Sequence, residues 1–200
     1  MALDENILNS VEASPIAMVV TNPRRPDNPI EIANRAFCCL TGYEQNEVVG
    51  RNCRFLGGDG TEAGAREQIR AAVGKERPVL VDILNYRRDG TPFRNGVMIA
   101  PLFDEEGRLA YFLGSQVDLG SGDAAGLVPR RARASALVAD LPDRQRQVLE
   151  GMAAGLLNKQ IAYRLGIAEK TVKMHRALML ERLGGISSAE AIRIAVEAGL

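Results

Sequence analysis

Residues 52–56 of the chain read Asn52-Cys53-Arg54-Phe55-Leu56, so that a thiol stands between a carboxamide and a guanidinium. An isolated cysteine is usually a buried small hydrophobe. Here both polar neighbours can bind ligand groups, since a carboxamide pairs with a hydrogen-bonding edge and a guanidinium pairs with an anion. The pentapeptide therefore predicts a cysteine that faces a bound ligand.

The composition of the 200 residues, 46% hydrophobic and 25% charged, is that of a globular protein. The first seven residues hold two acidic and no basic side chains, and no apolar run approaches the roughly 18 residues of a membrane span. Three cysteines, Cys38, Cys39 and Cys53, are too few for a disulfide framework, and the one histidine, His175, leaves no Cys/His set for a metal. We expect a cytoplasmic protein that binds neither a metal nor a membrane.

Charge divides the chain into two parts. Residues 1–128 carry 13 Lys and Arg against 18 Asp and Glu, whereas residues 129–200 carry 12 against 7, which gives net charges of −5 and +5. The seven small or polar residues 120–126 lie at this boundary and have the composition of a linker. We expect a first domain (residues 1–119), a linker and connecting helix (residues 120–139) and a second domain (residues 140–200). A basic domain beside an acidic one suits a phosphate-binding module with a regulatory partner, although a chance split gives the same charges.

The first domain is predicted to have an α+β fold, an antiparallel sheet with helices. Runs rich in β-branched and aromatic residues alternate with turn signals, which indicates hairpins. The expected strands are Ala17–Thr21, Val79–Tyr86, Pro92–Phe103 and residues 109–117. Helical patterns cover residues 34–41, 44–48 and 62–73, the last with Thr61 as its N-cap.

The second domain is predicted to be all-α, with four helices divided by glycines at positions 155, 166 and 184–185. Two of these helices are joined by a tight turn at Gly166, and the later one is polar and basic, which is the layout of a helix-turn-helix. A basic helix face that is merely solvated would carry the same charges. As a DNA-binding module, the domain is expected to contact double-stranded DNA through Lys159, Lys170, Thr171, Lys173 and Arg176.

The first domain resembles the LOV photosensors, the flavin-binding branch of the PAS fold, over residues 13–118. The motifs occur in the family's order: an opening strand and turn at residues 20–30, an adduct-forming loop at residues 50–56, and later strand motifs at residues 85–86, 90–95 and 111–116. One position departs from the pattern, because Gly57 stands where many members have a glutamine that contacts the cofactor. The resemblance implies a five-stranded antiparallel sheet with FMN as the cofactor.

The resemblance also implies roles for individual residues. Arg54 and Arg70 would bind the phosphate, because the fork of an arginine engages two phosphate oxygens. Asn85 and Asn95, ten residues apart on consecutive strands, would face the polar edge of the ring. The remaining contacts are expected from Asn52, Cys53, Leu56, Val97, Ile99, Phe112, Gly114 and Gln116.

The implied photochemistry centres on Cys53. Blue light would drive its sulfur reversibly onto ring carbon C4a, while ring nitrogen N5 gains a proton and becomes a hydrogen-bond donor. Gln116 carries both an amide oxygen and an amide nitrogen, so a rotation of its carboxamide can follow this change. The strand that carries Gln116 would pass the change to the linker.

The second domain resembles the LuxR-type effector domains. Residues 158–162 and 170–176 are similar to the central signature of that family, and Gln145 departs from the glutamate that many members carry. In the last helix, residues 187–199, a wide apolar arc leaves only a narrow polar strip of Glu190, Arg193 and Glu197. Such an arc either sinks into the helix's own domain or packs against a second protomer or the first domain. The interface residues we expect are Ala191, Ile194, Ala195 and Ala198.

Together these features predict a blue-light-regulated transcription factor rather than an enzyme. In the dark the first domain would cover the second domain of a monomer, and light would release the second domain to form a homodimer on DNA. Two alternatives remain at this point: a flavoenzyme or redox sensor with Cys53 as a thiol nucleophile, and a PAS regulator that senses another small ligand. The dinucleotide-binding pattern Gly-x-Gly-x-x-Gly is not in the sequence, which disfavours the flavoenzyme.

Overall fold

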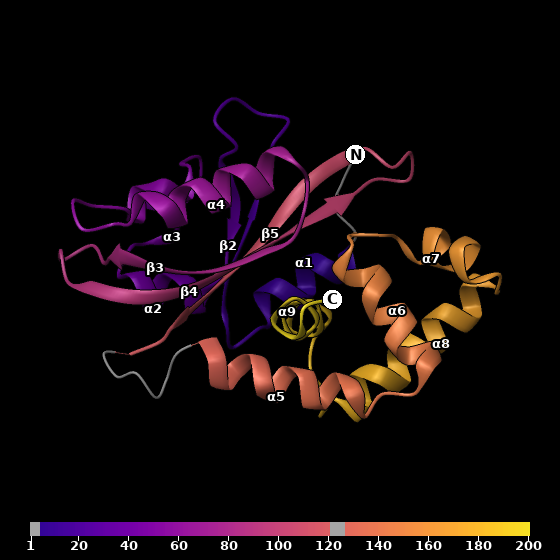
Figure 1. Ribbon diagram of the computed structural model, residues 1–200. Coiled ribbons are helices and arrows are strands. Elements are labelled where there is room, and N and C mark those ends of the chain that lie inside the picture. Colours follow the sequence, from indigo (N-terminus) through magenta and orange to yellow (C-terminus); the bar gives the residue numbers. More distant parts are fainter. Residues whose placement is uncertain (1–4, 121–126) are drawn as a thin grey trace.

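The first domain is built on a five-stranded antiparallel sheet in the order β2-β1-β5-β4-β3. The computed structural model describes residues 5–120 and 127–200 (Figure 1). The strands are β1 (Ala17–Thr21), β2 (Ile30–Ala33), β3 (Val79–Tyr86), β4 (Pro92–Phe103) and β5 (Leu109–Asp118). The α+β class and the long hairpin strands predicted from the sequence are confirmed.

Helices cover both faces of this sheet. The first domain contributes α1 (Glu5–Glu12), α2 (Arg35–Thr41), α3 (Gln45–Val48), the 3-10 helix η1 (Cys53–Leu56) and α4 (Ala63–Gly74). Strand β1 is buried on both sides. Ala17 and Val19 pack with Phe37 and Leu56 on one face of the sheet, whereas Met18 and Val20 belong to a second apolar cluster on the other face. The side chains of a strand alternate between the two faces, so each face of the sheet has its own apolar core.

Three short elements of the first domain were not predicted, one of them η1 in the expected loop 50–56, and one predicted helix cap was wrong. Helix α1 and strand β2 have 8 and 4 residues, too short for their periodicity to stand out. The Thr61 hydroxyl does not cap α4, whose N-cap is Glu62. It donates instead to the Leu84 carbonyl at 2.7 Å and so ties the loop before α4 to β3.

The second domain is all-α, as predicted. Its helices are α6 (Asp143–Ala153), α7 (Asn158–Leu165), α8 (Glu169–Arg182) and α9 (Ser188–Ala198), preceded by the connecting helix α5 (Leu127–Ala139). Val148, Leu149, Ile161, Val172 and Met179 are almost fully buried in its core. Linker residues 121–126 lie outside the described residues, and within the described ones no helix is long and apolar enough to cross a bilayer.

Helix α9 of the second domain packs against the sheet of the first domain. Figure 1 shows α9 nearly end-on between the sheet and α5, whereas α4 lies on the opposite side of the sheet. The same apolar cluster includes Met98 and Leu113 of the sheet and Ala191 and Ala195 of α9. The two domains therefore share one continuous core across this contact.

Candidate functional site

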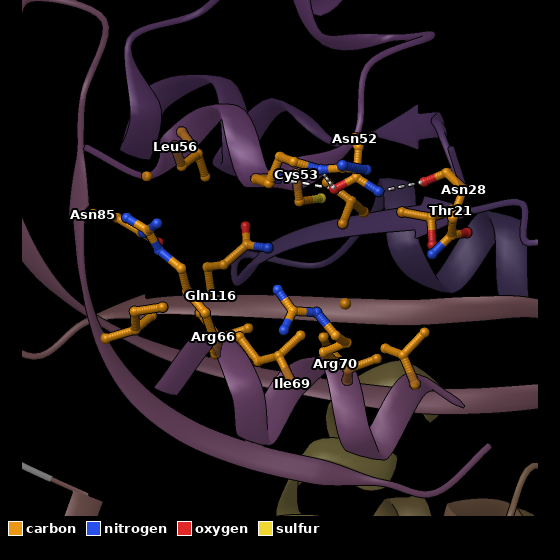
Figure 2. Close-up of a pocket in the computed structure, with 18 of the residues that line it drawn as sticks. Thr21, Asn28, Asn52, Cys53, Leu56, Arg66, Ile69, Arg70, Asn85 and Gln116 are labelled. Atoms are coloured by element: carbon orange, nitrogen blue, oxygen red, sulfur yellow. Dashed lines mark hydrogen bonds between the residues drawn. The ribbon is translucent and has the colours of Figure 1, made fainter. Parts of the chain in front are cut away.

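A cavity of about 850 Å³ lies between the sheet, η1 and α4. This volume suits a cofactor-sized ligand. All twelve residues predicted for the cofactor site line it, and Figure 2 shows several of them. They come from three regions of the chain: Asn52, Cys53, Arg54 and Leu56 from the loop and η1, Arg70 from α4, and Asn85, Asn95, Val97, Ile99, Phe112, Gly114 and Gln116 from the sheet.

Asn52 fixes the geometry around Cys53. Its side-chain oxygen accepts from the Arg54 N–H at 3.0 Å and so caps η1, while its amide nitrogen donates to the Asp27 carbonyl at 2.6 Å. The carboxamide predicted to contact a ligand thus also holds the thiol-bearing turn against the loop after β1. Capping residues of this kind orient the first turn of a helix.

Burial raises the pKa of the Cys53 thiol to about 12. Desolvation disfavours the charged thiolate, and the hydrogen bond from the Cys53 backbone offsets only part of that cost. The side chain is therefore a thiol at neutral pH. Reactive cysteine nucleophiles have lowered pKa values, so this environment argues against the redox nucleophile weighed above.

Three carboxamides gather on the cavity face of the sheet. Asn95 donates to the Asn85 side-chain oxygen at 2.9 Å, which the diagonal position of the two residues on β3 and β4 allows. Asn95 is fully buried and Gln116 is 4% exposed. In the described part of the chain, no partner is bonded to the side-chain oxygen of either residue. A buried acceptor without a partner destabilises the folded protein by about 1–3 kcal/mol. The two free oxygens therefore indicate that the cavity binds a ligand that donates hydrogen bonds.

The residues fit a flavin on these observations. The carboxamides offer donors and acceptors to a pyrimidine edge, and Val97, Ile99 and Phe112 supply apolar walls. Gly114 has no room for a side chain, because an added Cβ would lie 2.9 Å from a methyl group of Val19. Together these residues make a slot between β5 and the thiol that suits a flat ring.

Four arginines line the cavity, two more than predicted. Arg54 pairs with Asp27, Arg70 with Glu67 and Arg25 with Glu31, whereas Arg66 donates to the Gly58 carbonyl at 2.9 Å. Sequence reasoning missed Arg25 and Arg66. Arg66 lies four residues before Arg70 on α4, a spacing that places both on one helix face and could have revealed it.

The second domain carries the expected helix-turn-helix. Gly166 ends α7 in the left-handed conformation, with φ 66°. Lys159, Lys170 and Lys173 are exposed and Thr171 is half-buried. Arg176 is placed differently from these residues, since it donates to the Ser188 hydroxyl at 2.7 Å and to the Asn158 side chain at 3.3 Å. This arginine thus holds together the starts of α7 and α9.

The contact of α9 with the sheet differs from the predicted one. Ala191 and Ala195 are fully buried, and Ile194 and Ala198 are partly buried. The polar strip is not on the surface, because Arg193 is only 2% exposed and Glu197 is 8% exposed. The Arg193 guanidinium donates to the Ser115 hydroxyl of β5 and lies 2.7 Å from the Glu197 carboxylate. The two opposite charges thus neutralise each other, as burial requires, while the Arg193 Nη2 and Glu197 Oε1 atoms have no hydrogen-bond partner among the described residues.

Three further hydrogen bonds join the domains. The Phe103 N–H donates to the Gly155 carbonyl at 3.2 Å, and the Gln160 side chain donates to the Asp104 carbonyl at 3.1 Å. At the start of α9, the Ala189 N–H donates to the Ser10 hydroxyl of α1 at 2.9 Å. The second domain is therefore held by the β4–β5 turn, the sheet face and α1 together.

Two family models match separate parts of the chain. The family model "PAS domain" matches residues 15–121, and the model "Bacterial regulatory proteins, luxR family" matches residues 139–195. The chain thus belongs to the PAS family, with a first domain of the LOV type and a second domain of the LuxR helix-turn-helix type.

Three relatives illustrate the likeness. A blue-light-activated histidine kinase of Brucella anthropi is 50% identical over 110 residues, which are 55% of this chain and 22% of the kinase. A Light-Oxygen-Voltage domain solved in a study of a flavin analogue is 39% identical with a TM-score of 0.58, over 62% of this chain and 92% of that one. The LOV domain of the Erythrobacter litoralis EL346 kinase is 41% identical with a TM-score of 0.52, over 54% of this chain and 99% of that one.

Proposed function

We propose that this protein is a blue-light-regulated transcription factor that binds FMN in the first domain and double-stranded DNA with the second. The observation that carries the proposal is the position of β5 between the two sites. Gln116 lines the cavity, whereas its neighbour Ser115 is bonded to Arg193 of α9. A structural change at the cavity can therefore be passed to the DNA-binding domain through two adjacent residues of β5.

The chain's own residues would prepare the light reaction. When bound, the flavin absorbs blue light and offers ring carbon C4a to a thiol and ring nitrogen N5 to that thiol's proton. Because burial keeps Cys53 protonated, this side chain supplies both the sulfur and the proton. Arg54 and Arg70 would hold the phosphate, and Asn85 and Asn95 would hold the ring edge.

Gln116 would carry the change to the interface. Its side-chain oxygen has no partner among the described residues, so the carboxamide can rotate without losing a protein hydrogen bond on that atom. A reversed hydrogen bond in a buried site costs about 1–3 kcal/mol, enough to shift a two-state equilibrium about tenfold or more. We infer that β5 moves, the Ser115–Arg193 contact weakens, and the freed second domain dimerises on paired half-sites.

The test combines spectroscopy with DNA binding. The purified protein is expected to be yellow, to bleach reversibly in blue light, and to bind DNA more tightly in light than in the dark. The Cys53→Ala variant should keep the yellow colour and lose both the bleaching and the gain in affinity. Light scattering should report a monomer in the dark and a dimer in light. Equal affinity for DNA in the two states would reject the regulatory part of the proposal, and a colourless protein would reject the cofactor.

A further inference from the structure

The charge of Arg66 is not neutralised, unlike that of the other arginines in the cavity. Arg25, Arg54 and Arg70 each form an ion pair with a carboxylate, and within residues 5–120 and 127–200 no ion pair includes Arg66. Its guanidinium is anchored by the Gly58 carbonyl, a neutral acceptor. Most of its five donors and its full charge thus remain for a ligand.

The position of Arg66 is set by the glycine loop between η1 and α4. A Cβ added to Gly57 would lie 3.8 Å from the Arg66 Nη2 atom. The guanidinium therefore lies where a long side chain at position 57 would extend. Because Gly57 has no side chain, the long side chain of Arg66 can occupy the space beside it.

This loop belongs to the end of the cavity that holds the carboxamides. Gly58 packs so closely on Tyr86 that an added Cβ would lie 2.6 Å from its ring, and the Thr61 hydroxyl donates to the Leu84 carbonyl. Both partners flank Asn85 on β3. Arg66 and Arg70, both labelled in Figure 2, are one helical turn apart on α4, about 6 Å along the axis, so their guanidiniums can reach different parts of the cavity.

We propose that Arg66 contacts the pyrimidine edge of the bound flavin, in the space that Gly57 leaves open. This inference rests on the proposed function, since it requires a flavin in the cavity. A carbonyl oxygen of the pyrimidine edge accepts the charge-assisted hydrogen bond, which is stronger than one from a neutral amide. A fixed positive charge beside the ring also favours its reduced, more negative states, so Arg66 raises the midpoint potential of the flavin.

Binding of two flavins to the apo-protein tests the proposal, because riboflavin has the ring and lacks the phosphate of FMN. Arg66→Ala is expected to weaken binding of both flavins about tenfold in a fluorescence-quenching titration. The double variant Gly57→Gln/Arg66→Ala should recover part of that affinity, because a carboxamide then enters the same space. Lys75→Ala, which removes an exposed cation at the end of the same helix, should leave both affinities unchanged.

The charge itself is tested by Arg66→Gln, which keeps hydrogen-bond donors without the cation. This variant should bind flavin more tightly than Arg66→Ala and show a midpoint potential below that of the wild type. Unchanged affinities in Arg66→Ala would overturn the inference, and so would a loss confined to FMN, which would assign Arg66 to the phosphate. These outcomes differ from failure of the proposed function, in which the wild type itself binds no flavin.

Discussion

Cys53 shows how burial decides the chemistry of a single residue. Cys53 is half-buried where η1 lines the cavity, and desolvation raises the pKa of its thiol from 9.0 to about 12. The thiol form is favoured by folding, so its contribution to stability is fully present below about pH 9 and is lost as the pH rises towards 12. Cys39, by contrast, is exposed on the surface of α2.

This difference predicts selective alkylation. With iodoacetamide at about pH 8.5, Cys39 should react readily while Cys53 reacts at least tenfold more slowly, because the thiolate is the reactive form. Mass spectrometry of tryptic peptides gives the two rates. In urea the rates should converge, which serves as the control. Equal rates in the folded protein would contradict the assigned burial of Cys53.

Individual residues also mark the limit of what the sequence predicts. The twelve residues predicted for the cofactor site could be proposed together because the order of the motifs selects them, and all twelve line one cavity. Arg193 and Glu197 could not, because two charges on a helix usually face water and nothing local indicates the Ser115 hydroxyl that meets them. A partner 78 positions away is a property of the folded chain.

At the scale of single elements, one carboxylate, that of Asp104, stabilises the turn between β4 and β5. Asp104 accepts from the backbone N–H groups of Glu106 and Arg108 and pairs with the guanidiniums of Arg24 and Arg108. Burial would raise the pKa of this carboxyl, but these partners outweigh it and lower the pKa to about 2. Its carbonyl meanwhile accepts from Gln160 of α7, so the same residue shapes the turn and holds the second domain.

Asp104→Asn should therefore lower the melting temperature at neutral pH. A lowered pKa contributes stability above the ordinary value of 3.8, and the contribution is lost as the pH falls towards about 2. The difference between wild type and variant should shrink over that interval in thermal melts followed by circular dichroism. Asp89→Asn, in the exposed β3–β4 turn, is a comparison that should leave interdomain contacts intact. A difference that stays constant down to pH 2 would contradict this account.

The turn between α6 and α7 holds a glycine for two reasons. Gly155 has φ 77°, and an added Cβ would lie 2.3 Å from the Pro101 carbonyl of β4. Gly155→Ala should separate the domains in the dark, seen as faster proteolysis of the linker. Gly185→Ala is the matched control, since its φ of 72° carries similar backbone strain with open space around the new methyl group. Similar proteolysis of the two variants would show that strain, not the clash, is responsible.

At the scale of the whole molecule, the longer strands and helices were predictable, whereas their assembly was not. Turn signals and β-rich runs predicted the positions of β3, β4 and β5, and glycines predicted the boundaries between the helices of the second domain. The sequence left open whether α9 packs in its own domain, on a second protomer or on the first domain. In the structure it packs on α5 and on the sheet at once, through a surface that includes a buried ion pair.

The buried Arg193–Glu197 ion pair and its hydrogen bond to Ser115 should make the contact between the two domains reversible. Ser115→Ala leaves a buried Arg193 donor without its partner, at a cost of about 1–3 kcal/mol, and should raise DNA affinity in the dark about tenfold. Arg193→Met/Glu197→Met removes both charges, and apolar residues often pack more stably than a buried ion pair, so this variant should respond weakly to light. Ser135→Ala, at an exposed serine of α5, is the control. Electrophoretic mobility shifts in dark and light measure all three, and unchanged dark affinity in Ser115→Ala would contradict the assigned role.

The two-sided burial of β5 has a consequence for how this chain can vary. Alternate residues of β5 face the cavity, and the residues between them face α9. A one-residue insertion or deletion within the strand would therefore exchange the two sets. Gln116 would then meet the helix and Ser115 the ligand. Substitutions can adjust either site alone, but changes in strand length alter both at once. We expect natural length variation among relatives of this architecture to fall in the turns and the linker, and never inside this strand.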